Sequence, residues 1–304
     1  MKGGVQHRST LKTVLWTILI VFVVVFIFVP LLFSFFHSSK FGNIARIPIQ
    51  GVITGDGASS LAQESVSSQT IVQFIHEADE NSNVKVILLE INSPGGSAVA
   101  SDEIASALKQ TQKPVVALIR EVGASGGYWI ASAADHIIAN RMSITGSIGV
   151  ISSYLELSQL MEKYGVHYEQ LMAGEYKDLG TPFRELKPDE RNLLQAKLDT
   201  IHQFFIEEVA MNRNLSVAKV QRIATGEFYL GIEAQKLGLV DELGNQQTAE
   251  DYIKRTYNIE TIDYVDYQEQ HGLLDVLSHV TATWFFHIGQ GIGSSMTQHS
   301  FPLT

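Results

Sequence analysis

The chain has 304 residues, a formal net charge of −10 and no cysteine. The lack of cysteine excludes thiol catalysis, zinc–thiolate sites and disulfide bonds. No basic cluster indicates nucleic-acid binding, and the length fits one compact domain of roughly 200–250 residues with attached segments.

The N-terminal region contains a long apolar run. Residues 14–36 carry no charged side chain. At 1.5 Å per residue a helix over this run would span about 34 Å, enough to cross a hydrocarbon core of ~30 Å. The run exceeds the apolar region of a cleaved signal peptide, and no small-residue cleavage site follows it. We therefore predict an uncleaved single-pass transmembrane helix over 14–36; a helix buried in a globular core is the alternative.

Basic residues on the two sides of this run predict its orientation. The amino terminus, Lys2, Arg8 and Lys12 precede it, whereas Lys40 and Arg46 follow it. The positive-inside rule therefore favours, by a small margin, a cytoplasmic N-terminus and an extracytoplasmic remainder. The predicted organisation is a cytoplasmic tail (1–13), an anchor (14–36), a linker (37–43), a globular domain (44–270) and a C-terminal helix and tail (271–304).

Strands and helices alternate along the globular domain. Residues 84–91 (VKVILLEI) form a near-continuous apolar run, as expected of a parallel strand that is buried on both faces. The alternation predicts an α/β fold with a largely parallel sheet. We expect strands over 44–53, 84–91, 115–119, 136–139, 149–153 and 168–172. We expect helices over 68–80, 97–109, 125–134, 155–164, 189–212, 216–224 and 231–237.

The C-terminal segment has apolar residues at near-helical spacing. They are Leu273, Leu277, Val280, Trp284 and Ile288. We predict a packing helix here; an oligomer contact or a membrane-surface contact is the alternative.

Ser125 lies in a run of small residues (123–127, GASGG) between a predicted strand and a predicted helix. Small neighbours allow close approach of a substrate, and a helix N-terminus offers N–H groups and partial positive charge to a developing oxyanion. The context allows a nucleophile; a helix-capping serine is the alternative.

Residues 92–96 (NSPGG) also follow a buried strand. Their glycines could present N–H groups to a cleft or to an extended peptide, or form an ordinary turn.

A serine nucleophile requires a base. The histidines that could serve lie outside Gly-rich motifs: His76, His136, His167 and His202. A neutral lysine can replace histidine when burial favours its uncharged form. The candidate lysines are Lys163, Lys177, Lys187 and Lys197. Lys177 lies in an irregular segment between Gly174 and Gly180, which favours it only slightly.

Taken in order, these motifs resemble the signal peptide peptidase A family, serine peptidase family S49. The motifs are NSPGG (92–96), ASGGY (124–128), TGSIGV (145–150), and GEYKD (174–178) with PFR (182–184). The run GLVDELG (238–244) also fits. The resemblance covers roughly 44–245 and implies the ClpP/crotonase-like superfold, built from repeated β-β-α units, behind an N-terminal transmembrane helix.

The resemblance also implies roles for individual residues. Ser125 matches the nucleophile and Lys177 the general base of a Ser–Lys dyad. Gly96 and Gly126 match the residues whose backbone N–H groups form the oxyanion hole, and Ser147 matches a serine that orients the lysine. No metal and no cofactor are implied. Because the chain looks like the short form of the family, a homo-oligomeric ring such as an octamer is expected, with Ser125 and Lys177 of one site supplied by different protomers.

The expected function is that of a membrane-anchored serine endopeptidase that degrades cleaved signal peptides and other extended apolar peptides. It would sit in the bacterial cytoplasmic (inner) membrane, with a protease domain (44–270) on the extracytoplasmic or periplasmic side. Expected partners are these peptides, the lipid bilayer and further copies of the chain, but no nucleic acid. The alternatives are a broader quality-control protease of the same clan, a non-catalytic peptide-binding scaffold, and a crotonase-like acyl-CoA enzyme.

Overall fold

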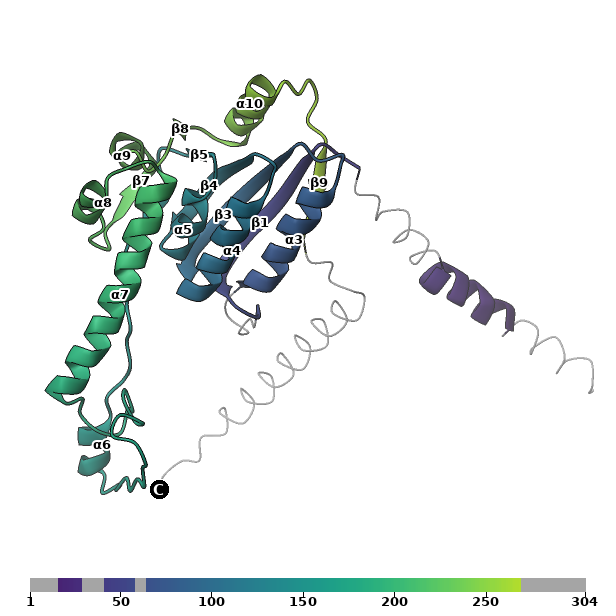
Figure 1. Cartoon of the computed structure of the whole chain (residues 1–304). Helices are drawn as coiled ribbons and strands as arrows, with labels where there is room; N and C mark the ends of the chain where they lie inside the picture. Colours follow the sequence, from purple (N-terminus) through teal and green to yellow (C-terminus); the bar gives the residue numbers. More distant parts are fainter. Residues whose placement is uncertain (1–15, 29–40, 58–63, 269–304) are drawn as a thin grey trace, which may run out of the picture.

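The structure is a computed structural model that describes residues 16–28, 41–57 and 64–268 (Figure 1). Its strands are β1 (Ile44–Thr54), β2 (Ser65–Ser67), β3 (Val86–Gly96), β4 (Val115–Ala124), β5 (His136–Ala139), β6 (Ile144–Gly146), β7 (Phe228–Leu230), β8 (Glu242–Leu243) and β9 (Tyr264–Asp266). Its helices from residue 68 on are α3 (Ser68–Glu80), α4 (Ala98–Gln110), α5 (Gly126–Ser132), α6 (Ser158–Lys163), α7 (Pro188–Asn212), α8 (Val217–Ile223), α9 (Gly231–Leu237) and α10 (Gln246–Tyr257).

The strands form one sheet in the order β2-β1-β3-β4-β5-β8, with β9 beside β1 and β6 between β4 and β7. The pairings are parallel except that of β6 with β7. In β3, Val86, Ile87, Leu88 and Leu89 are all buried, because helices cover both faces of the sheet there. The predicted α/β fold with a largely parallel sheet is confirmed.

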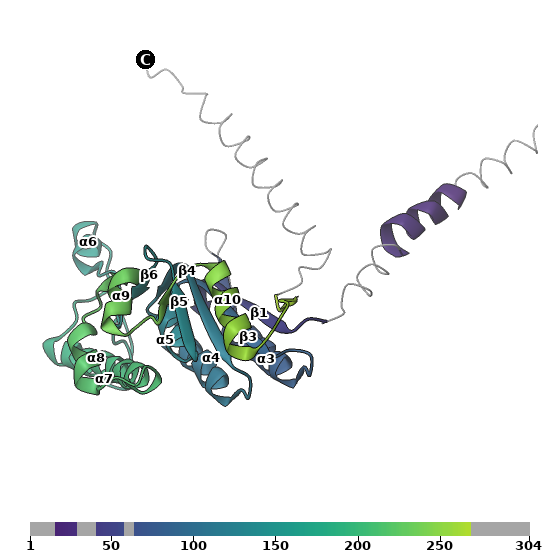
Figure 2. The same ribbon diagram turned by 90° about the horizontal axis from the view of Figure 1, so that it is seen from above.

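Alternate residues of β3 contribute to two hydrophobic cores. Ile87 and Leu89 pack in the core shared with α3, α4 and α5, whereas Val86 and Leu88 pack in a smaller core with Ile253 of α10. Figure 2 shows α10 on the face of the sheet opposite α3, α4 and α5. The helix α10 and the strand β9, which pairs with the start of β1, were not predicted.

A projecting arm, residues 147–204, extends from the sheet and carries α6 at its far end (Figure 1). The long helix α7 forms its stem and returns the chain to the core, where Phe205, Ile206 and Val209 are buried. The strands predicted over 149–153 and 168–172 are wrong, since neither segment has regular structure. Neither pairs with a strand of the sheet, and most of their side chains are exposed, so the apolar residues that suggested strands do not enter the core. The predicted helix over 155–164 is shorter, as α6 (Ser158–Lys163).

The described part of the predicted transmembrane span is residues 16–28. It is helical and ends in a π-helical turn, η1 (Val24–Phe28). Within the ranges that the structure describes, no helix combines the length and the apolar character needed to cross a membrane. The remainder of the 14–36 prediction lies outside the described residues, as do the predicted tails 1–13 and 271–304.

Candidate active site

Ser125 lies at the turn between β4 and α5, in a strained backbone conformation. Its φ of 52° and ψ of −122° lie in a region that residues other than glycine rarely adopt. Its N–H donates to the Gly146 carbonyl at 2.8 Å, and its own carbonyl accepts from Trp129 N–H at 2.9 Å. Such strain is found mainly at functional sites, and a sharp strand-to-helix turn that exposes a serine hydroxyl is the geometry of a nucleophile.

The glycines at the end of β3 lie directly against the Ser125 turn. A methyl group on Gly95 would approach the Gly126 nitrogen to 2.7 Å and Ser125 Cβ to 2.8 Å. One on Gly126 would lie 2.3 Å from Ser101 Oγ and 3.3 Å from the Gly96 nitrogen. Only glycine permits this close packing. Gly126 also opens α5, so its N–H is among those that lack a partner within the helix.

Ser125 lines two cavities of different character. One, of about 350 Å³, includes Gly96 and Gly126, and its remaining wall is largely apolar, with Trp129, Leu198, Ile201 and Phe205. The other, of about 460 Å³, is more polar and includes Ser147, Gln195, Asp199, His202 and Thr225. Both cavities share Gly149, Val150, Ile151 and Leu198. Ser125 therefore borders a largely apolar cavity and a more polar one.

Ser147 follows β6 and lines the more polar cavity together with Ser125. Its φ is 49°, its N–H donates to the Glu227 carbonyl at 2.9 Å, and its hydroxyl donates to the Gly226 carbonyl at 3.4 Å. Thus four of the five predicted site residues (Ser125, Gly96, Gly126 and Ser147) come together around one point of a single chain.

Lys177 is not part of this group within one chain. It lies in a turn of the projecting arm between α6 and α7, is exposed, and lines neither cavity that contains Ser125. Its N–H donates to the Gly174 carbonyl at 3.2 Å. Figure 1 shows α6 and the first residues of α7 at the end of the arm, far from α5.

The residue after Lys177 belongs to an ion network in which two buried carboxylates share one partly exposed arginine. Arg184 donates from Nε and Nη2 to both carboxylate oxygens of Asp178, at 2.6 and 2.8 Å. It donates from Nη1 and Nη2 to both oxygens of Glu190, at 2.8 and 2.6 Å. The Asp178 and Glu190 side chains are only 5% and 1% exposed. We call Asp178, Arg184 and Glu190 the arginine clamp.

The arginine clamp predicts a pH dependence. The hydrogen bonds from Arg184, aided by the Lys187 N–H, lower the pKa of Glu190 from its ordinary 4.5 to about 2. A carboxylate with a lowered pKa stabilises the fold above its unfolded pKa and loses that effect as pH falls through its folded pKa. The stabilisation that the clamp gives the arm should therefore be complete above pH 4.5 and be lost progressively as the pH falls from 4.5 towards 2. Carboxyl ¹³C NMR should show the lowered pKa of Glu190 in the wild type and a pKa closer to 4.5 in Arg184→Gln. A pKa near 4.5 for Glu190 in the wild type would contradict the prediction.

The sequence did not single out His202, yet it lines the cavity beside Ser125. Its Nε2 lies 3.3 Å from the Ile148 carbonyl. It shares one face of α7 with Gln195, Leu198 and Asp199, which recur at helical spacing. That spacing was visible in the sequence, but the sequence did not show that this face of α7 would lie against the turn that carries Ser125. In the part of the chain that is described, no basic side chain is hydrogen-bonded to the Ser125 hydroxyl.

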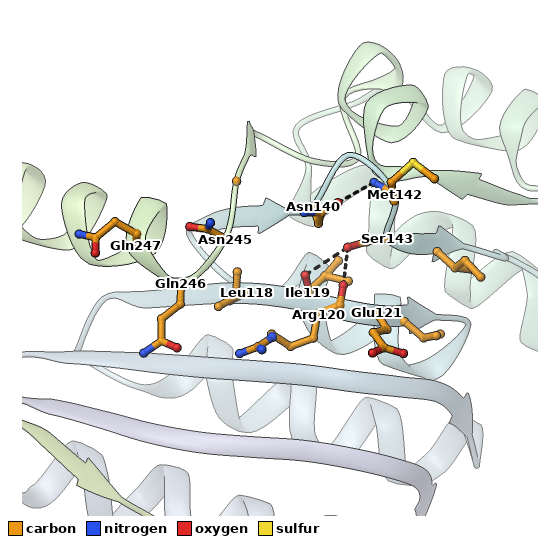
Figure 3. A pocket seen from close by; sticks show the side chains of 13 residues that line it. Leu118, Ile119, Arg120, Glu121, Asn140, Met142, Ser143, Asn245, Gln246 and Gln247 are labelled. Atoms are coloured by element: carbon orange, nitrogen blue, oxygen red, sulfur yellow. Dashed lines mark hydrogen bonds between the residues drawn. The ribbon is translucent and has the colours of Figure 1, made fainter.

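A larger cavity, of about 660 Å³, lies beside β4, near the start of α10 (Figure 3). It contains none of the predicted site residues. The buried Ser143 hydroxyl points to the carbonyls of Ile119 and Arg120 and donates to both, so it is already engaged. Across the described ranges, no three acidic, histidine or cysteine side chains cluster as a metal site requires. The size of this cavity therefore does not make it a candidate for the chemistry.

Known proteins resemble this chain over most of its length. The sequence profile of peptidase family S49 matches residues 107–260. A proposed protease of Methanocaldococcus jannaschii is 34% identical over 243 residues, which cover 79% of this chain and 76% of that protein. A proposed signal peptide peptidase SppA of Enterococcus faecium is 33% identical over 230 residues, covering 74% and 67%. The chloroplastic serine protease SPPA of Arabidopsis thaliana is 34% identical over 221 residues, which cover 72% of this chain but 32% of that protein.

The parallel α/β sheet, the strained serine beside two glycines and the match to a peptidase family together identify a protease of the serine class. The chain belongs to peptidase family S49. The resemblance that the ordered motifs indicated is thereby confirmed.

Proposed function

We propose that the chain is a membrane-anchored serine endopeptidase that degrades cleaved signal peptides and other extended apolar peptides with a Ser125–Lys177 dyad. The observation that carries the proposal is the strained Ser125 turn packed against Gly95 and Gly96. This arrangement supports a nucleophile whose cavity also contains Gly96 and Gly126, the proposed backbone donors to the reacting carbonyl. Such preorganised donors are worth about 10²–10³ in rate each.

In the proposed reaction, neutral Lys177 takes the proton of the Ser125 hydroxyl as its oxygen attacks a peptide carbonyl. The N–H groups of Gly96 and Gly126 stabilise the tetrahedral oxyanion. The C–N bond then breaks, the amine leaves with the proton returned by Lys177, and the acyl chain stays as an ester on Ser125. Water hydrolyses this ester, again with Lys177 as the base, and releases the acid product.

The dyad is proposed to form between protomers of a ring. Lysine acts as a base only when uncharged, and burial favours that form. Lys177 is exposed in the single chain, so a second copy would have to cover it. The arm also exposes many large apolar side chains, which supports a contact with another copy: Ile151, Leu155, Leu160, Tyr164, Val166, Leu171 and Met172.

An anchor over 14–36 would hold the site near apolar peptides that remain in the bilayer and raise their effective concentration. The apolar cavity beside Gly96 and Gly126 supports a preference for an apolar side chain next to the scissile bond.

The direct test is to incubate the full chain in detergent or liposomes with synthetic signal peptides and identify products by mass spectrometry. Cleavage within the apolar region is expected. Cleavage only of unfolded exported proteins would favour the broader quality-control protease.

A second mechanism has one specific observation in its favour: His202 shares a cavity with Ser125 in the same chain. Replacing His202 by glutamine tests it, because glutamine keeps a donor for the Ile148 carbonyl but cannot act as a base. With Lys177 as the base, we expect kcat/KM to change by less than about tenfold. A loss of roughly 10⁴-fold or more, with assembly unchanged, would instead assign the base to His202.

A further inference from the structure

We propose that Arg184 is a positioning residue for Lys177: the arginine clamp sets where the lysine amine arrives in the active site. This inference rests on the proposed role of Lys177 as the base. It concerns residues that touch neither cavity beside Ser125.

The turn that carries Lys177 has only local backbone hydrogen bonds. They join Lys177 to Gly174, Leu179 to Tyr176, and Thr181 to Asp178. Among the described residues, no hydrogen bond links 174–181 directly to α7. The connection runs through Arg184, which holds Asp178 on one side and Glu190, in the first turn of α7, on the other. The described hydrogen bonds that connect the Lys177 turn to α7 therefore all pass through this one guanidinium.

The paired hydrogen bonds of the arginine clamp constrain the positions of its two carboxylates. Arg184 binds each carboxylate through two N–H groups, which fixes both distance and plane. Glu190 also accepts a hydrogen bond from the Lys187 N–H at 2.9 Å. Its carboxylate is thereby tied to the backbone at the start of α7. A lysine at position 184 would keep the charge but could not form both paired contacts.

The stem α7 links the clamp to the nucleophile's own core. Phe205 of α7 stacks on Trp129 of α5, with ring centroids 4.6 Å apart. The same α5 begins one residue after Ser125. A continuous helix thus joins the Ser125 turn of a protomer to the clamp beside its Lys177. In the proposed ring of identical copies, the distance along α7 from the Ser125 turn to the clamp determines where each lysine meets a neighbour's serine.

The test compares Arg184→Gln, Arg184→Lys and the matched control Arg191→Gln on the full chain with a signal peptide. Arg191 is an exposed arginine of α7 outside the clamp. Because small misplacements of a catalytic group cost about 10²-fold, we expect Arg184→Gln to lower kcat by roughly that factor. KM should stay within about twofold, since substrate binding is not altered. Arg184→Lys should be intermediate and Arg191→Gln unchanged.

Mixed rings separate positioning of the lysine from general damage. Arg184→Gln chains keep Ser125, and Ser125→Ala chains keep an intact clamp and lysine, so co-assembly should restore activity as fully as a Lys177→Ala and Ser125→Ala mixture does. The proposal would be overturned if Ser125→Ala chains restored activity when mixed with Lys177→Ala chains but not when mixed with Arg184→Gln chains. Full activity of Arg184→Gln chains alone would also overturn it. Should Arg184→Gln fail to assemble, Asp178→Asn and Glu190→Gln are judged by the same comparison. Full activity of Lys177→Ala would instead refute the proposed function.

Discussion

Ser125→Ala should abolish peptide cleavage while the fold and the assembly stay intact. Removing a serine nucleophile of this kind costs roughly 10⁶-fold in kcat. The structural cost should be small, because the described contacts of Ser125 are made by its backbone N–H and carbonyl and not by its hydroxyl. Alanine can occupy the same strained conformation. The measurement is kcat on a synthetic signal peptide, with thermal unfolding and size-exclusion chromatography alongside.

Labelling by a serine-directed covalent probe provides the second readout for this variant. The wild type should carry the label on Ser125, and the Ala variant should not be labelled. Ser153 is an exposed serine two residues after Ile151, which lines both cavities, so Ser153→Ala is the matched control and should be labelled and active. A wild type that binds signal peptides but neither cleaves them nor takes the label would identify a peptide-binding scaffold.

Lys177→Ala should be almost as damaging, since without a base the Ser125 hydroxyl is a weak nucleophile. We expect a loss of about 10⁴-fold or more in kcat. Lys163→Ala removes an exposed lysine from α6 in the same arm and should retain activity. Activity of Lys177→Ala near that of the wild type would remove this residue from the mechanism.

Mixing Lys177→Ala with Ser125→Ala chains tests whether the dyad spans two protomers. Neither variant alone has a complete site. In a randomly mixed ring of equal parts, about one quarter of the sites would combine an intact serine with an intact neighbouring lysine. Recovery of about that share of the wild-type kcat is expected after co-refolding. No recovery, in rings shown by mass spectrometry to be mixed, would place both residues in one chain.

Local sequence patterns were sufficient for much of the sheet and its helices. The helix α3, the strand β5 and the helix α9 begin and end at the predicted residues. These elements follow from the spacing of apolar residues and from turn residues at their ends, which are properties of neighbouring positions. Residues 149–153 and 168–172 have the same local pattern but pair with no strand among the described residues, so a pattern-based strand prediction fails there.

The sequence by itself determined the parallel α/β class and, through motifs in a fixed order, the peptidase family and its candidate residues. Only the tertiary structure decided how those residues lie: Ser125 is strained against Gly95, His202 lines a cavity beside it, and Lys177 lies in the projecting arm next to Asp178, which Arg184 binds. The physical reason is that a strained backbone angle, a cavity or a buried ion pair arises from contacts between distant segments, which no local periodicity encodes.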